Sequence, residues 1–174
     1  MLKKVFLVLT VLLVILVLIS FVLPQKQHVE RSLDISSSAE KIYPYLANPK
    51  LFREWSPWSK MDPNMQVQFT GPEAGKGAGM SWKSDDPSVG SGSWVIKEAI
   101  ENKSLNVEMD FGDQGTATSF FYLKPNAEKT NVTWGFDTDA GNNPIMRWFG
   151  LMMDKMVGNE YAKGLANLKS IMEK

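Results

Sequence analysis

The chain has 174 residues, no cysteine, and 19 basic side chains against 19 acidic ones, so its formal net charge is zero. The charges are scattered along the sequence, which excludes the basic surface that nucleic-acid binding requires. The lack of cysteine excludes disulfide bonds and thiol chemistry.

An apolar run from Val5 to Leu23 predicts a membrane anchor. At about 1.5 Å per helical residue the run reaches roughly 28 Å, close to the thickness of the hydrocarbon layer of a bilayer. Two lysines precede it, and the positive-inside bias places that end in the cytoplasm. We therefore expect residues 1–24 to be a single-pass anchor in the bacterial inner (cytoplasmic) membrane. Residues 25–174 would form one soluble domain on the extracytoplasmic side.

A cleaved secretory signal is the alternative interpretation of this run. Such signals have about 7–15 apolar residues followed by small residues at the cleavage site. The first alanine of this chain is Ala39 and its first glycine is Gly71, so the sequence favours an uncleaved anchor. A buried core helix is disfavoured because the run is apolar on all sides and not along one stripe.

The soluble part opens with a predicted strand and two short helices. Residues 28–36 alternate with one face made of Val29, Arg31, Leu33 and Ile35, which is typical of a strand. A serine-capped helix then ends at Asn48-Pro49, and a second short helix, residues 50–55, stops before Pro57.

Period-two alternation dominates the middle of the chain and predicts six further strands. They lie at residues 65–69, 80–82, 92–100, 105–111, 117–123 and 130–137. A glycine-rich turn, residues 71–79, joins the first two, because glycine permits the positive φ values of tight turns. Residues 117–123 have aromatic side chains on both faces.

The C-terminal part predicts one long helix. Asn142 or Asn143 can cap it, and Pro144 suits its first position. Apolar residues recur at helical spacing over nearly thirty residues: Ile145, Phe149, Met152, Met153, Met156, Val157, Tyr161, Leu165, Leu168 and Met172. The apolar face of the sheet needs cover, so we expect an α+β fold in which the sheet curls around this helix.

This element order resembles the helix-grip fold of START-like and Bet v 1-like proteins (the SRPBCC superfamily), in particular the bacterial polyketide cyclase/dehydrase and lipid transport branch. The matching motifs are Ile35-x-x-x-Ala39-x-x-Ile42, Trp55-Ser-Pro-Trp58, Gly75-x-Gly77-x-Gly79, Thr130-x-Val132-Thr133-Trp134 and Gly164-Leu165-x-x-Leu168-Lys169. The resemblance covers about residues 28–173. It implies a curved antiparallel sheet of about seven strands around the long helix, with a ligand cavity between them and no shared catalytic residue.

Residues that could support catalysis or bind metal are few. His28 is the only histidine and follows the anchor closely, so we interpret it as a solvated linker residue. Asp85-Asp86 and Asp137-x-Asp139 lack the spacing of a calcium loop and suit turns. We predict no catalytic residue, no metal and no cofactor. Glu98 shares a predicted face with Trp94 and is the one carboxylate that could point inward, where burial would raise its pKa, unless it lies at the open rim.

The sequence is rich in aromatic residues and methionine, with 6 Trp and 10 Met. Such side chains build a packed core and an adaptable apolar pocket equally well. The candidate cavity residues are Trp82, Trp94, Glu98, Phe111, Phe121, Trp134, Phe136, Met153 and Met156.

These observations favour a membrane-tethered module that binds an apolar small molecule or a lipid between the sheet and the C-terminal helix. One alternative is a cyclase- or dehydratase-type enzyme that uses the same cavity. Another is a ligand-free envelope domain that binds protein partners through an exposed apolar patch. The sequence names neither the ligand nor a protein partner.

Overall fold

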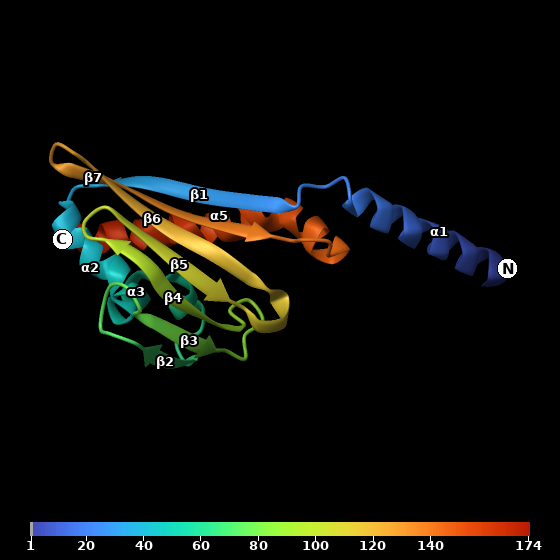
Figure 1. Ribbon diagram of the computed structural model, residues 1–174, viewed down its shortest axis with the longest axis horizontal. Helices are drawn as coiled ribbons and strands as arrows, with labels where there is room; N and C mark the ends of the chain where they lie inside the picture. Colours follow the sequence, from blue (N-terminus) through green and yellow to red (C-terminus); the bar gives the residue numbers. More distant parts are fainter. Residues whose placement is uncertain (1) are drawn as a thin grey trace.

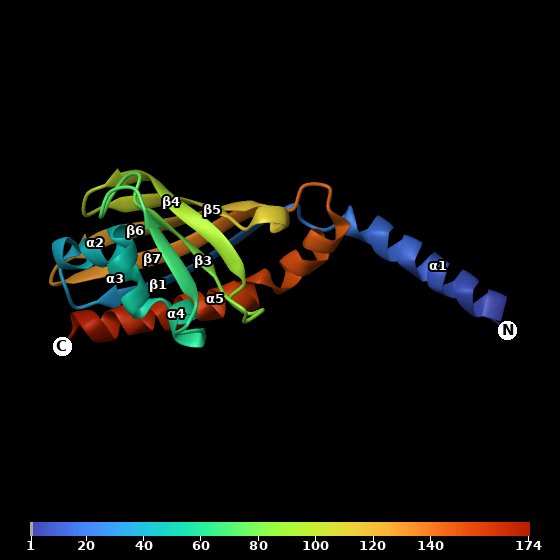
Figure 2. The same cartoon turned by 90° about the horizontal axis from the view of Figure 1, so that it is seen from below.

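The computed structural model describes residues 2–174. It begins with the helix α1 (Leu2–Ser20), which projects away from the rest of the chain in Figures 1 and 2. Within the described residues, α1 is the one helix long and apolar enough to cross a membrane, and none of its most apolar 18-residue window is buried. Residues 26–174 form an α+β domain.

The domain is built on one seven-stranded antiparallel sheet. Its spatial order is β1-β7-β6-β5-β4-β3-β2, so only β1 and β7 are neighbours in space without being consecutive in sequence. The strands are β1 (Lys26–Ile35), β2 (Gln66–Thr70), β3 (Gly79–Lys83), β4 (Ser91–Ile100), β5 (Ser104–Asp110), β6 (Thr116–Asn126) and β7 (Lys129–Asp139). All seven predicted strands are confirmed.

Three short helices follow β1, where the sequence predicted two. They are α2 (Ala39–Ala47), α3 (Pro49–Trp55) and α4 (Pro57–Met61). The Asn48 side chain accepts hydrogen bonds from the Lys50 and Leu51 amides and so caps α3. Pro57 at the start of α4 explains both the end of α3 and the new helix, since proline suits the first turn.

The long helix α5 (Pro144–Met172) crosses the inner face of the sheet along β1 (Figure 2). Asn143 caps it by accepting from the Ile145 and Met146 amides. Gly150 and Gly158 allow a close approach to β1, because a Cβ at either position would overlap the Gln27 or Arg31 side chain. Arg31 in turn donates to both carboxylate oxygens of Asp154, at 2.9 and 3.1 Å. The predicted cover of the sheet by this helix is confirmed.

The domain has two ends, which the strand register defines. At the anchor end β1 begins, β7 ends and α5 begins, with Lys26 opposite Asp139. At the distal end β1 finishes with Ile35 opposite Thr130, and α5 terminates. Figure 1 shows α1 leaving from the anchor end.

Hydrogen bonds from α5 hold the last turns of α1 at the anchor end. Arg147 is 6% exposed and donates from Nη1 to the carbonyls of Ser20 (3.4 Å) and Phe21 (3.1 Å), while its Nε donates to the Gly141 carbonyl. The Trp148 indole donates to the Leu16 carbonyl at 3.1 Å. These bonds fix the position of α1 relative to α5.

Candidate functional site

The distal part of the space between the sheet and α5 is filled by stacked aromatic rings. Trp134 of β7 lies flat on Tyr161 of α5, with ring centroids 3.9 Å apart and planes 12° apart. Phe121 stacks on Trp134 at 5.3 Å, and Trp55 meets it edge-on at 5.0 Å. Trp55 is fully buried, with its indole donating to the Tyr45 carbonyl. This half of the interior is a packed core.

The polar groups inside this core bond to one another. Ser119 accepts a hydrogen bond from the Trp134 indole at 3.1 Å and donates to the Gly135 carbonyl at 2.9 Å. Burial raises the pKa of Tyr161 well above its ordinary value, and a hydrogen bond with Ser119 opposes that shift only in part. The phenol is therefore neutral at physiological pH, and it can orient a ligand group but is a poor general base.

The anchor end of the same interior is less tightly covered. Trp82, Met109 and Phe111 lie on the inner face near the anchor ends of β3 and β5, and all three are only partly buried. Trp82 meets Phe111 edge-on at 6.0 Å and donates its indole hydrogen to the Val89 carbonyl. Apolar surface thus remains accessible where the strands approach the anchor.

The predicted cavity residues fall mostly on this inner face. Its buried members are Trp94, Phe121, Trp134, Phe136 and Met153, and its partly buried members are Trp82 and Phe111. Met156 is 47% exposed on the opposite side of α5. Each helical residue advances by about 100°, so Met156 is rotated by roughly 60° from Met153 and roughly 140° from Tyr161, the residues that pack on the sheet. Its place among the cavity candidates is therefore not supported.

Glu98 points outward, which rules out the inward position that the sequence left open. The β4–β5 register shifts between Ile96 and Glu98, so an extra residue, Lys97, breaks the alternation. Ile96 is buried, whereas Glu98 is exposed on the outer face and accepts a hydrogen bond from the Asn106 side chain at 2.9 Å. A pattern of alternating apolar and polar residues does not reveal such a β-bulge.

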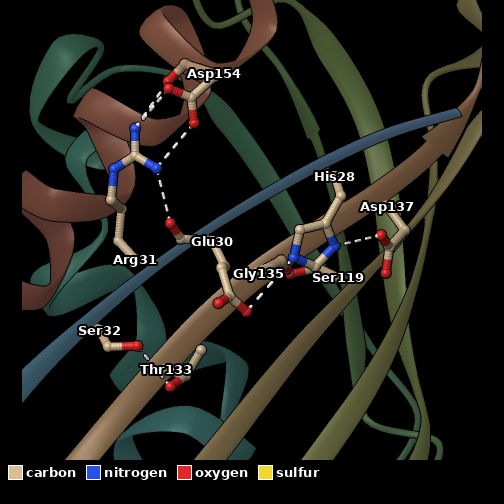
Figure 3. Close-up of polar contacts among 9 residues, drawn as sticks. All are labelled: His28, Glu30, Arg31, Ser32, Ser119, Thr133, Gly135, Asp137 and Asp154. Carbon is tan, nitrogen blue, oxygen red and sulfur yellow. Dashed lines mark hydrogen bonds and ion pairs between the residues drawn. The ribbon is translucent and has the colours of Figure 1, made fainter. Parts of the chain in front are cut away.

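The outer face of the sheet holds a shallow hollow of about 480 Å³. His28 lies here in β1, which corrects its interpretation as a linker residue. Its Nδ1 is 2.7 Å from Asp137 Oδ1 on β7, as Figure 3 shows, and its ring stacks on Phe120. The hydrogen bond to Asp137 is the main cause that raises the pKa of His28. The lining residues are His28, Glu30, Lys97, Glu98, Asn106, Val107, Glu108, Thr118, Phe120, Tyr122 and Asp137.

The charged groups around this hollow are largely paired. Lys97 bonds to Glu108 at 3.0 Å, and His28 lies between Asp137 and Glu30. In Figure 3, Arg31 points instead to Asp154 on α5, because alternate residues of β1 face opposite sides. Across residues 2–174, His, Asp and Glu side chains form no group of three or more that could hold a metal ion.

A second hollow of about 380 Å³ lies beside β2 and the loop after β3, and Asp85 and Asp86 line it. Asp86 accepts from the Ser88 amide, and the Ser84 hydroxyl donates to Asp62. Asp86 therefore organises a turn, as the sequence suggested.

Residues 26–173 match the family model described as polyketide cyclase / dehydrase and lipid transport. The chain belongs to this family. No curated protein matches the sequence. The family description suggests a cyclase-like domain or a domain that binds a hydrophobic ligand.

Solved structures share the cyclase/lipid-transport fold at low sequence identity. Protein Ms6760 from Mycobacterium smegmatis is 14% identical, with a TM-score of 0.59 over 84% of this chain and 91% of its own. The Aha1 protein from Colwellia psychrerythraea, solved as a dimer, is 17% identical, with a TM-score of 0.60 over 84% and 96%. Ara h 8.0201 is 10% identical, with a TM-score of 0.54 over 83% and 99%. At these identities the likeness shows the fold alone.

Sequence reasoning missed two features of the domain that bear on a candidate site. The buried Ser119 and Tyr161 form a polar centre in the core. The one sequence signal for it was the alternation of residues 117–123, which placed Ser119 on the same face as Phe121. The His28–Asp137 pair joins residues 109 positions apart, so a strand register was needed to find it.

Proposed function

We propose that this protein is a membrane-anchored module that binds an apolar or lipid-like small molecule between the sheet and α5, at the anchor end. The observation that carries the proposal is the gradient of burial along the interior. At the distal end Trp55, Leu165 and Leu168 are at most 1% exposed, whereas Trp82, Met109 and Phe111 at the anchor end remain partly accessible. A ligand can occupy the accessible end without disrupting the packed one.

The side chains at the anchor end support an apolar ligand. Methionine is flexible and adapts to irregular shapes, while Trp82 and Phe111 offer broad apolar surfaces. Burial of apolar surface contributes about 25 cal/mol per Å², so a lipid-like chain would gain affinity mainly from contact area. The neutral hydroxyls of Ser119 and Tyr161 lie deeper and would meet at most one polar group of the ligand.

The anchor supports a location at the membrane. α1 is a 19-residue helix whose only charged residues, Lys3 and Lys4, lie at its start. Those lysines favour a cytoplasmic N-terminus. We infer that residues 1–24 span the inner membrane and that residues 25–174 lie on its extracytoplasmic side.

The test fills the proposed site with a larger side chain, so that a ligand can no longer enter it. Ala117 is buried on the inner face opposite Met109, and the neighbouring Thr118 is exposed on the outer face. The full chain, isolated in lipid nanodiscs, should be probed with a fluorescent fatty-acid analogue. Ala117→Phe should reduce binding at least tenfold, whereas the matched control Thr118→Phe should bind like the native protein. Equal binding by both variants, with circular dichroism unchanged, would rule out the interior as the site.

A further inference from the structure

Helix α5 carries a second apolar stripe that the sheet does not cover. Ile145, Phe149, Met152 and Met156 are 76%, 38%, 55% and 47% exposed. Their spacing of four, three and four residues places them on one helical face, turned away from the stripe that packs on the sheet. Beyond Met156 the same face becomes polar, with exposed Lys163 two turns further on.

The stripe belongs to a segment almost without free charge. Arg147 is the one charged residue among residues 144–153, and its guanidinium is directed at the backbone carbonyls of Gly141, Ser20 and Phe21. The guanidinium carbon of Arg147 also lies 5.4 Å from the centroid of the Phe21 ring. The first ten residues of α5 therefore present an outward face without charge. Asp154 and Lys155 follow beside Met156, and Asp154 is paired with Arg31.

The contacts between α5 and α1 set the depth of this segment relative to a bilayer. Trp148 bonds to the carbonyl of Leu16, which lies seven residues before the end of the apolar run at Leu23. At about 1.5 Å per residue, that carbonyl is roughly 10 Å inside the end of the run. Arg147 bonds to the carbonyls of Ser20 and Phe21, three and two residues before Leu23, so the start of α5 lies within roughly 5 Å of that end. Helix α5 therefore begins near the boundary of lipid headgroups and acyl chains, where tryptophan is enriched.

We propose that the first three turns of α5, residues 144–156, lie in the interfacial layer of the membrane that α1 crosses, with the stripe Ile145, Phe149, Met152 and Met156 facing the lipid. The proposal rests on the membrane anchor proposed above but not on ligand binding. An amphipathic helix of this kind binds at the boundary of headgroups and chains through its apolar face. The surface is continuous with α1, which is exposed along its whole apolar length. That continuity favours lipid over a soluble protein as the occupant.

This second contact would fix the orientation of the domain. A single membrane-spanning helix can tilt and rotate in the bilayer, and the domain fixed to it would move with it, but a second contact with the membrane restricts that motion. The anchor end of the interior, with Trp82 and Phe111, is then held near the lipid. A lipid-like molecule could pass from the leaflet to the interior without crossing bulk water, where exposure of apolar surface is unfavourable.

The test uses site-specific fluorescence in the full chain. The native sequence has no cysteine, so Ile145→Cys, Phe149→Cys and Met152→Cys each provide one attachment point for an environment-sensitive dye. Lys163→Cys, on the same helical face but beyond the stripe, is the matched control. Leu13→Cys within α1 reports on the anchor. Each labelled protein is placed in phosphatidylcholine/phosphatidylglycerol vesicles with or without nitroxide-labelled lipids.

The expected result is that nitroxide lipids quench most of the emission at positions 145, 149 and 152 and at position 13, and leave position 163 unchanged. Quenching at position 13 alone would overturn the interfacial contact but keep the anchor. A blue-shifted but unquenched dye at position 149 would mean that protein, such as a second copy, covers the stripe, which also overturns the proposal. Absence of quenching at position 13 would refute the anchor itself.

Discussion

Tyr161 and Trp134 form a parallel stack, 3.9 Å between ring centroids, that joins α5 to β7, the strand next to the edge strand β1. The stack lies where the packed distal core gives way to the more accessible anchor end. Its residues come from the last strand and the last helix, so the stack can form only when the C-terminal third of the chain has docked.

Replacing Trp134 with alanine should destabilise the domain by about 3–5 kcal/mol, because a large ring that is 3% exposed would leave a cavity. Trp82→Ala is the matched comparison, since Trp82 is only partly buried. It should cost clearly less. Urea unfolding of the purified protein, followed by circular dichroism, gives both values. Equal costs would show that the two ends of the interior are equally well packed.

Gly135→Ala should destabilise the sheet by about 1–3 kcal/mol, because the new methyl group would overlap the ring of Phe120 on the neighbouring strand. The double variant Gly135→Ala/Phe120→Ala should recover part of the loss relative to the sum of the single variants, since the overlap is then removed. The double-mutant cycle is measured by the same unfolding experiment. Strict additivity would mean that the ring of Phe120 does not cover Gly135.

The pKa of His28 should lie above its ordinary value of 6.5, chiefly because the imidazolium bonds to Asp137. A pKa raised in the folded state means that protonation stabilises the fold. This contribution is complete below the unfolded pKa and is lost as pH rises through the folded pKa. Asp137→Asn should move the His28 pKa back toward 6.5, and NMR titration of the single histidine measures it. An unchanged pKa in the variant would exclude the Asp137 bond as the cause.

Alkaline phosphatase fused after Lys174 should be active in bacterial cells, since the lysines before the apolar run favour a cytoplasmic N-terminus. The native protein should also remain with the membrane after carbonate washing. A matched fusion with Lys3→Glu and Lys4→Glu should show reduced activity if these charges set the orientation. Release of a shortened soluble protein would instead support a cleaved signal.

The regular periodicities predicted the fold well. Alternation located every strand, and Asn143-Pro144 marked the start of α5 to within one residue. The errors arose where the direction of a side chain depends on how its strand or helix packs against distant parts of the chain. The β-bulge before Glu98 reversed which side its side chain faces.

The apolar residues of α5 show the same limit. The sequence treats them as one hydrophobic set, but the structure divides them into a stripe that meets the sheet, with Met153 and Tyr161, and an exposed stripe that includes Ile145 and Met152. Assigning each residue to a stripe requires knowledge of where β1 lies. The pairing of His28 with Asp137 likewise depends on the β1–β7 register.

The direct passage from α1 into β1 has a mechanical consequence. In Figure 1 α1 joins the domain at the start of β1, so a pull on α1 acts on that end of the strand. β1 is held to β7 by an antiparallel ladder that runs from Lys26 to Ile35. A force along the strand loads all the bonds of that ladder together in shear and does not peel them apart one by one. A pull on α1 along β1 would therefore meet the arrangement of hydrogen bonds that best resists tension.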